Sequence, residues 1–167
     1  MAREEHENKS LAAKAAWPLL VLTAVLQVYF GLSAVAYPFM GVPTSASGLG
    51  GWIAATMGGL QGVAAVVAFM LAVRRDLRGT TLAVAGSIML GWLSTLPSVF
   101  EQGLDFYGDS KLIPVYFGAP PIVAIAAATL AWRNVYPIAA SLIVSAMTFA
   151  GLLFVVAFAL VIAMYGF

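Results

Sequence analysis

The chain is built from long apolar segments separated by short polar connections. Five such segments lie at about residues 17–37, 50–73, 80–100, 114–132 and 137–167. A helix rises about 1.5 Å per residue and a bilayer core is about 30 Å thick, so about 20 apolar residues cross it. The pattern therefore predicts an all-α integral membrane protein, a bundle of five transmembrane helices.

The fourth segment fits this pattern least well. Pro114, Pro120 and Pro121 bias its first turns away from a regular helix, because proline lacks an amide hydrogen and restricts the residue before it. An alternative is a re-entrant segment, which would place Arg133 outside the cell and the C-terminus inside. The distribution of basic residues favours five spans over this alternative.

Orientation is predicted from the lysines and arginines, which favour the cytoplasmic side of a membrane. With five spans, seven of the eight basic residues fall on the side of the N-terminus, and only Lys111 falls on the other. The sequence therefore predicts a cytoplasmic N-terminus and an outside C-terminus. The seven residues are Arg3, Lys9, Lys14, Arg74, Arg75, Arg78 and Arg133.

Residues 1–14 are predicted to form a cytoplasmic polar tail, and residues 15–167 a single transmembrane helical domain. Ser10 is expected to cap the first helix at its N-terminus. Residues 34–36, Ala-Val-Ala, resemble a signal-peptidase site, so a signal peptide is the alternative for the first segment. A retained span is favoured, because the apolar run exceeds the about 7–15 residues of a signal peptide's apolar region.

Composition supports a membrane protein and excludes several kinds of chemistry. Hydrophobic residues make up 62% and charged residues only 9%, against about 25% charged in soluble domains. There is no cysteine, and the one histidine, His6, lies in the polar tail, so neither a thiolate site nor a haem or metal centre in the membrane is expected. No cofactor is predicted. The net charge of +1 argues against a nucleic-acid partner.

The polar residues inside the predicted spans are uncharged. Proton relays and ion-coupled carriers usually need ionisable groups at this depth, so such functions are disfavoured. The neutral residues are candidates for a pocket that binds a lipid or quinone head group; hydrogen bonding between helices is the favoured interpretation. Two of them, both amides, are expected at equal depth, facing the bundle interior and meeting directly or through one water. The candidates are Gln27, Gln61, Ser87, Ser145 and Thr148, with Gln27 and Gln61 as the pair.

Small residues recur at every fourth position on two of the predicted spans. Such stripes allow close backbone approach, which matters in lipid because apolar side chains gain little by leaving it. Packing within the protein's own bundle is the favoured interpretation, and contact with another subunit is the alternative. The stripes are Gly79, Ala83, Ser87, Gly91 and Thr95 on the third span, and Ala54, Gly58 and Gly62 on the second.

The outer connection after the third span carries the remaining candidates for function: Glu101, Asp105, Tyr107 and Asp109. An interfacial connector is favoured over a docking face or a pocket entrance. The sequence as a whole favours a non-enzymatic accessory or scaffold subunit of a larger membrane complex, of transporter or respiratory type, in a bacterial inner membrane. Membrane lipids and another membrane protein subunit are the expected partners. A lipid-, quinone- or small-molecule-binding protein is the alternative, and an enzyme is third.

Overall fold

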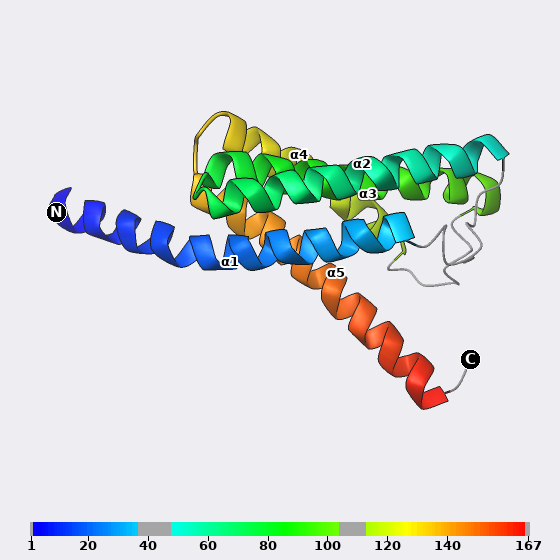
Figure 1. Ribbon diagram of the computed structural model, residues 1–167. Coiled ribbons are helices and arrows are strands. Elements are labelled where there is room, and N and C mark those ends of the chain that lie inside the picture. Colours follow the sequence, from blue (N-terminus) through cyan, green and yellow to red (C-terminus); the bar gives the residue numbers. More distant parts are fainter. Residues whose placement is uncertain (1, 37–47, 104–112, 166–167) are drawn as a thin grey trace.

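The computed structural model describes residues 2–36, 48–103 and 113–165, and these segments form five helices (Figure 1). Four of them contain apolar stretches long enough to cross a membrane: Ala16–Ala36, Gly48–Val73, Leu77–Glu101 and Pro137–Tyr165. The fourth helix contributes a shorter apolar stretch, Phe117–Trp132. The prediction of a multi-pass, all-α membrane protein is confirmed. The helices are α1 (Ala2–Ala36), α2 (Gly48–Val73), α3 (Leu77–Gln102), α4 (Ile113–Trp132) and α5 (Pro137–Tyr165).

Helix α3 is the centre of the bundle, because it packs against each of the other four helices. Figure 1 shows α1, α2 and α3 running roughly along one direction, whereas α5 crosses them obliquely and leads away from the bundle. The termini of the described chain therefore project from it: the start of α1 at one end and the last turns of α5 to one side (Figure 1).

The prediction that Ser10 caps the first helix is wrong. Helix α1 begins at Ala2 and continues through Ser10 into the apolar segment. The polar tail is rich in alanine, glutamate, lysine and arginine, which favour helix even where no packing supports it. Three glutamates near the start also suit the positive end of the helix dipole. These preferences extend the helix beyond the point where Ser10 would begin it.

Helices α2 and α3 form a hairpin joined by a short arginine-rich segment, residues 74–78, which we call the arginine turn. Helix α2 ends at Val73 and α3 begins at Leu77. The Asp76 side chain accepts a hydrogen bond of 2.8 Å from the backbone N–H of Gly79, which caps α3. Arg75 takes a left-handed conformation, with φ of 61°, so the chain reverses in very few residues.

Small side chains dominate the interior of the bundle. Of the fourteen buried apolar residues in the described part of the chain, ten are alanines, whereas many large apolar side chains face outwards. This distribution suits a bilayer, where close packing rather than removal from water holds helices together. The central cluster draws on all five helices: Leu20, Ala24, Ala68, Ala72, Val84, Ala85, Ile88, Ala124, Ala127 and Val144.

Helix α4 continues through its prolines, contrary to the expected irregularity. Pro120 and Pro121 lie inside the helix, which runs without a break to Trp132. Pro121 has no N–H for the carbonyl of Phe117, four residues earlier. The indole N–H of Trp92 on α3 donates to that carbonyl instead, at 2.9 Å. The neighbouring helix thus supplies the hydrogen bond that proline removes.

Candidate functional site

A cluster of buried polar side chains joins α1, α3 and α5. Gln27 is at its centre and is only 4% exposed. Its amide Nε2 donates to Thr148 Oγ1 at 2.8 Å, and its Oε1 accepts from the Ser87 hydroxyl at 2.9 Å. Thr148 passes its own hydrogen to the carbonyl of Val144. The Gln27 amide on α1 therefore links α3 and α5, through partners that lie 60 and 121 residues further along the chain.

A second connection lies one turn earlier on α1. The hydroxyl oxygens of Thr23 and Ser145 are 2.8 Å apart and hydrogen-bonded, and Thr23 also donates to the carbonyl of Leu19. Thr23 was not among the residues expected from the sequence. Its spacing from Gln27 was the available signal, because residues four apart share one face of a helix. With Thr23 added, the polar cluster is Thr23, Gln27, Ser87, Ser145 and Thr148.

The polar cluster is satisfied by its own hydrogen bonds. In the described part of the chain, no buried side-chain nitrogen or oxygen lacks a hydrogen-bond partner. A site for a head group would be expected to present unpaired donors or acceptors to its ligand. The arrangement therefore supports the interpretation of these residues as hydrogen bonds between helices.

The expected direct contact between Gln27 and Gln61 is absent. Gln27 is bonded to Ser87 and Thr148, and no hydrogen bond joins Gln61 to another described residue. Gln61 lies instead against Gly91, where a Cβ would stand 2.9 Å from Gln61 Nε2. The two amides meet different neighbours on α3, Gln27 at Ser87 and Gln61 at Gly91.

The small-residue stripes face the protein's own helices where they are buried. A Cβ on Gly31 of α1 would stand 2.8 Å from the Cα of Gly62, so the backbones of α1 and α2 nearly touch there. Gly58, one turn earlier on α2, lies against Ala34 in the same interface. On α3, Ser87 and Gly91 face Gln27 and Gln61. The favoured interpretation, packing within one bundle, fits these contacts.

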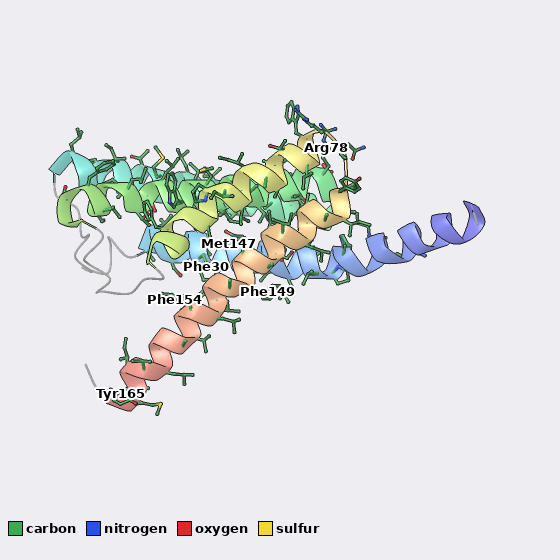
Figure 2. All side chains as sticks on the ribbon, turned by 180° about the vertical axis from the view of Figure 1, so that it is seen from behind. Phe30, Arg78, Met147, Phe149, Phe154 and Tyr165 are labelled. Carbon is green, nitrogen blue, oxygen red and sulfur yellow. The ribbon has the colours of Figure 1, made fainter. Side chains whose placement is uncertain are left out.

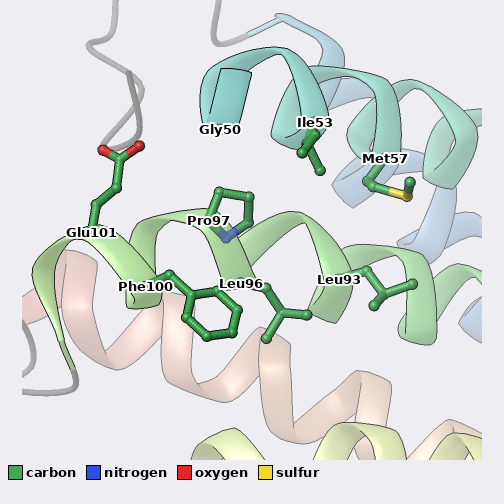
Figure 3. A pocket seen from close by; sticks show the side chains of 8 residues that line it. All are labelled: Gly50, Ile53, Met57, Leu93, Leu96, Pro97, Phe100 and Glu101. Carbon is green, nitrogen blue, oxygen red and sulfur yellow. The ribbon is translucent and has the colours of Figure 1, made fainter. Parts of the chain in front are cut away.

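A cavity of about 380 Å³ lies between α2 and α3, near the end opposite the arginine turn (Figure 3). This volume is within the range of small-molecule pockets. Figure 3 shows Ile53 and Met57 on the side of α2 that faces α3. The lining is apolar except at Glu101, whose carboxylate is exposed at the rim. The lining residues are Gly50, Ile53, Met57, Leu93, Leu96, Pro97, Phe100 and Glu101.

Of the outer-face candidates, the structure describes only Glu101. Asp105, Tyr107 and Asp109 lie outside the described residues. Within residues 2–36, 48–103 and 113–165, no group of histidine, aspartate or glutamate residues is arranged to hold a metal ion.

The opposite end of the bundle collects arginines and tryptophans from α1, α3, α4 and the turn between α2 and α3. The Arg75 guanidinium lies 5.0 Å from the centre of the Trp17 ring, and the Trp17 indole N–H donates to the carbonyl of Ala72. Arg78 donates from Nη2 to the carbonyl of Trp132 at 2.9 Å and lies 5.8 Å from its ring. The first turn of α3 is thereby tied to the last turn of α4.

Comparisons with known proteins give no further guide to this site. The chain matches no protein-family model, no curated protein and no solved structure. Its function must therefore be argued from its own residues.

Proposed function

We propose that this protein is a non-catalytic subunit of a larger membrane assembly, and that the second half of α5 contacts the partner. The observation that carries this proposal is a contrast within one helix. Ala140, Val144 and Thr148 are buried in the bundle, whereas every residue from Leu153 to Tyr165 whose side chain is described is exposed. Figure 2 shows this half of α5 leading away from the other helices to Tyr165.

The composition of α5 explains why its two halves behave differently. The first half carries alanine, serine and threonine on its packed face, and these allow close approach to α1 and α4. After Gly151 the sequence is dominated by leucine, valine, phenylalanine and isoleucine. Association in lipid depends on van der Waals packing. The described side chains of the second half are exposed, and contact with another membrane protein would cover them.

The orientation proposed is a cytoplasmic N-terminus, five crossings including α4, and an outside C-terminus, in a bacterial inner membrane. The described cations support it, because Arg74, Arg75, Arg78 and Arg133 lie together at one end of the bundle. Lipids surround the helices, and the partner is a transporter-type or respiratory-type membrane protein.

The test is purification in a mild detergent, with a partner identified by its fixed stoichiometry. Leu153→Ala with Leu160→Ala alters two exposed residues one heptad apart on α5 and should release the partner without changing thermal unfolding of the protein. The control is Leu60→Ala, another exposed leucine, on α2, which should retain the partner. Retention of the partner by the α5 variant, or a protein that purifies alone at its native expression level, would overturn the proposal.

The second candidate is a protein that binds a lipid, quinone or other apolar molecule. The polar cluster does not favour this candidate, because its hydrogen bonds are already satisfied. The cavity between α2 and α3 favours it, because its volume and its apolar lining suit an apolar molecule. Ile53→Trp would fill this cavity. If the second candidate is correct, an apolar molecule extracted with the wild-type protein should be missing from the variant. Equal recovery from both proteins would argue against this site.

A further inference from the structure

The arginine end of the bundle carries a concentrated positive charge. Among the described side chains, five cations lie there: Lys14, Arg74, Arg75, Arg78 and Arg133. The single described acid at this end is Asp76, and its carboxylate caps α3 through the Gly79 N–H. We call these five cations the basic band. At the other end, Glu101 is the one charged side chain that the structure describes.

Two tryptophans fix the depth of the basic band. Trp17 lies under Arg75, and Trp132 lies beside Arg78. Tryptophan favours the boundary between apolar chains and lipid head groups. Cation–π contact keeps each guanidinium at the level of its ring. Arg75 and Arg78 are therefore held where lipid phosphates lie, rather than extended into water.

Two further arginines are available to a ligand. Arg74 and Arg133 are exposed, and neither side chain makes a hydrogen bond or an ion pair with a described residue. A guanidinium presents several N–H groups in one plane, which matches the geometry of a phosphate. Arg133 directly follows Trp132, so its backbone lies beside the carbonyl that the Arg78 guanidinium binds.

We propose that the basic band binds the head groups of anionic phospholipids. Arg74 and Arg133 donate to phosphate oxygens, and the Arg75–Trp17 and Arg78–Trp132 pairs form the floor of the surface. Apolar side chains continue from this floor: Val73, Val135 and Tyr136 are exposed beside the arginines and contact the upper acyl chains. This continuity of charge with apolar surface fits a lipid and not a soluble anion or a nucleic acid.

Native mass spectrometry of the protein in a neutral detergent tests the proposal, with phosphatidylglycerol and phosphatidylcholine as the two probes. The wild type should bind phosphatidylglycerol more tightly. Because each basic residue at a membrane surface contributes about fivefold in affinity, Arg74→Gln with Arg133→Gln should weaken phosphatidylglycerol binding about 25-fold. Binding of phosphatidylcholine should change little. Because the protein is already folded in detergent, the measured affinity does not depend on membrane insertion or on topology.

Two controls distinguish the loss of positive charge from a loss of folding stability. Lys111→Gln removes one positive charge from another connection and should leave the preference for phosphatidylglycerol unchanged. Thermal unfolding of the double variant without added lipid should match the wild type, because the side chains of Arg74 and Arg133 are exposed and make no hydrogen bond or ion pair with a described residue. Arg74→Lys with Arg133→Lys should recover most of the binding. Equal binding of both lipids by the wild type, or an unchanged preference in the Arg→Gln variant, would overturn the proposal.

Discussion

The Trp92 indole N–H donates to the carbonyl of Phe117, the one carbonyl of α4 that Pro121 leaves without its helical donor. The two aromatic rings also pack together, with centroids 5.5 Å apart. Unpaired carbonyls are costly in a bilayer because no water is present to satisfy them. Trp92 therefore satisfies the carbonyl that Pro121 frees, and it joins α4 to α3 in doing so.

Trp92→Phe should destabilise the protein by about 1 kcal/mol, because an aromatic ring remains but the hydrogen bond is lost. Pro121→Ala restores an N–H that donates within α4. In the presence of Pro121→Ala, Trp92→Phe should therefore cost measurably less. Reversible unfolding in mixed detergent micelles measures the four proteins of this cycle. Equal costs with and without Pro121→Ala would show that the Trp92 contribution is packing alone.

The hydrogen bond from Trp92 to the carbonyl that Pro121 frees could not be predicted from the sequence. The apolar segments predict the helices within a few residues, because length and hydropathy are local properties. The effect of Pro120 and Pro121 is not local, since it depends on which side chain of α3 reaches the freed carbonyl. The prediction of an irregular start to the fourth segment used the proline alone and omitted the donor 25 residues away.

The backbones of α1 and α2 approach closely between Gly31 and Gly62, and this contact should be intolerant of any side chain. Gly31→Ala places a Cβ 2.8 Å from the Gly62 Cα, and backbone cannot move aside as a side chain can. We expect a loss of about 1–3 kcal/mol in unfolding free energy, typical of overpacking.

Two other glycines serve as controls for this prediction. Gly59→Ala meets nothing within 4 Å and should be neutral or slightly stabilising, since alanine favours helix. Gly91→Ala meets the end of the Gln61 side chain, which can rotate away, so its effect should lie between the two. If Gly59→Ala proved as damaging as Gly31→Ala, helix propensity rather than the α1–α2 contact would explain the losses.

Gln27 should contribute more to stability than Gln61, although both are amides at similar depth. Gln27→Leu removes the hydrogen bonds to Ser87 and Thr148 and leaves the buried Ser87 hydroxyl without its acceptor. We expect a loss of about 1–2 kcal/mol. Gln61→Leu removes no hydrogen bond to a described residue and should cost less than half of that. A larger effect at Gln61 in the same unfolding assay would reverse this assignment.

The members of the polar cluster, except Thr23, were predicted from the sequence, but the hydrogen bonds between them were not. Four of the five candidate residues, Gln27, Ser87, Ser145 and Thr148, meet in one place, because neutral polar side chains in lipid must find partners. Gln61 does not join them. The depth of a side chain follows from its position along a helix. The direction in which the side chain points depends on how α1 and α2 are turned about their own axes where they meet at Gly31 and Gly62. That rotation is a property of the packed pair.

The last prediction concerns the side of the membrane on which the arginine turn lies. Arg74, Arg75 and Arg78 are expected to hold this turn in the cytoplasm, because lysine and arginine near the ends of spans resist translocation. Changing all three to glutamine should give a mixture of orientations. A reporter that is active only in the cytoplasm, fused after Phe167, should be silent in the wild type and partly active in the variant. Lys111→Gln should leave the reporter silent, because an outer lysine does not anchor topology. Strong reporter activity in the wild type would contradict the five-span orientation and favour an α4 that does not cross.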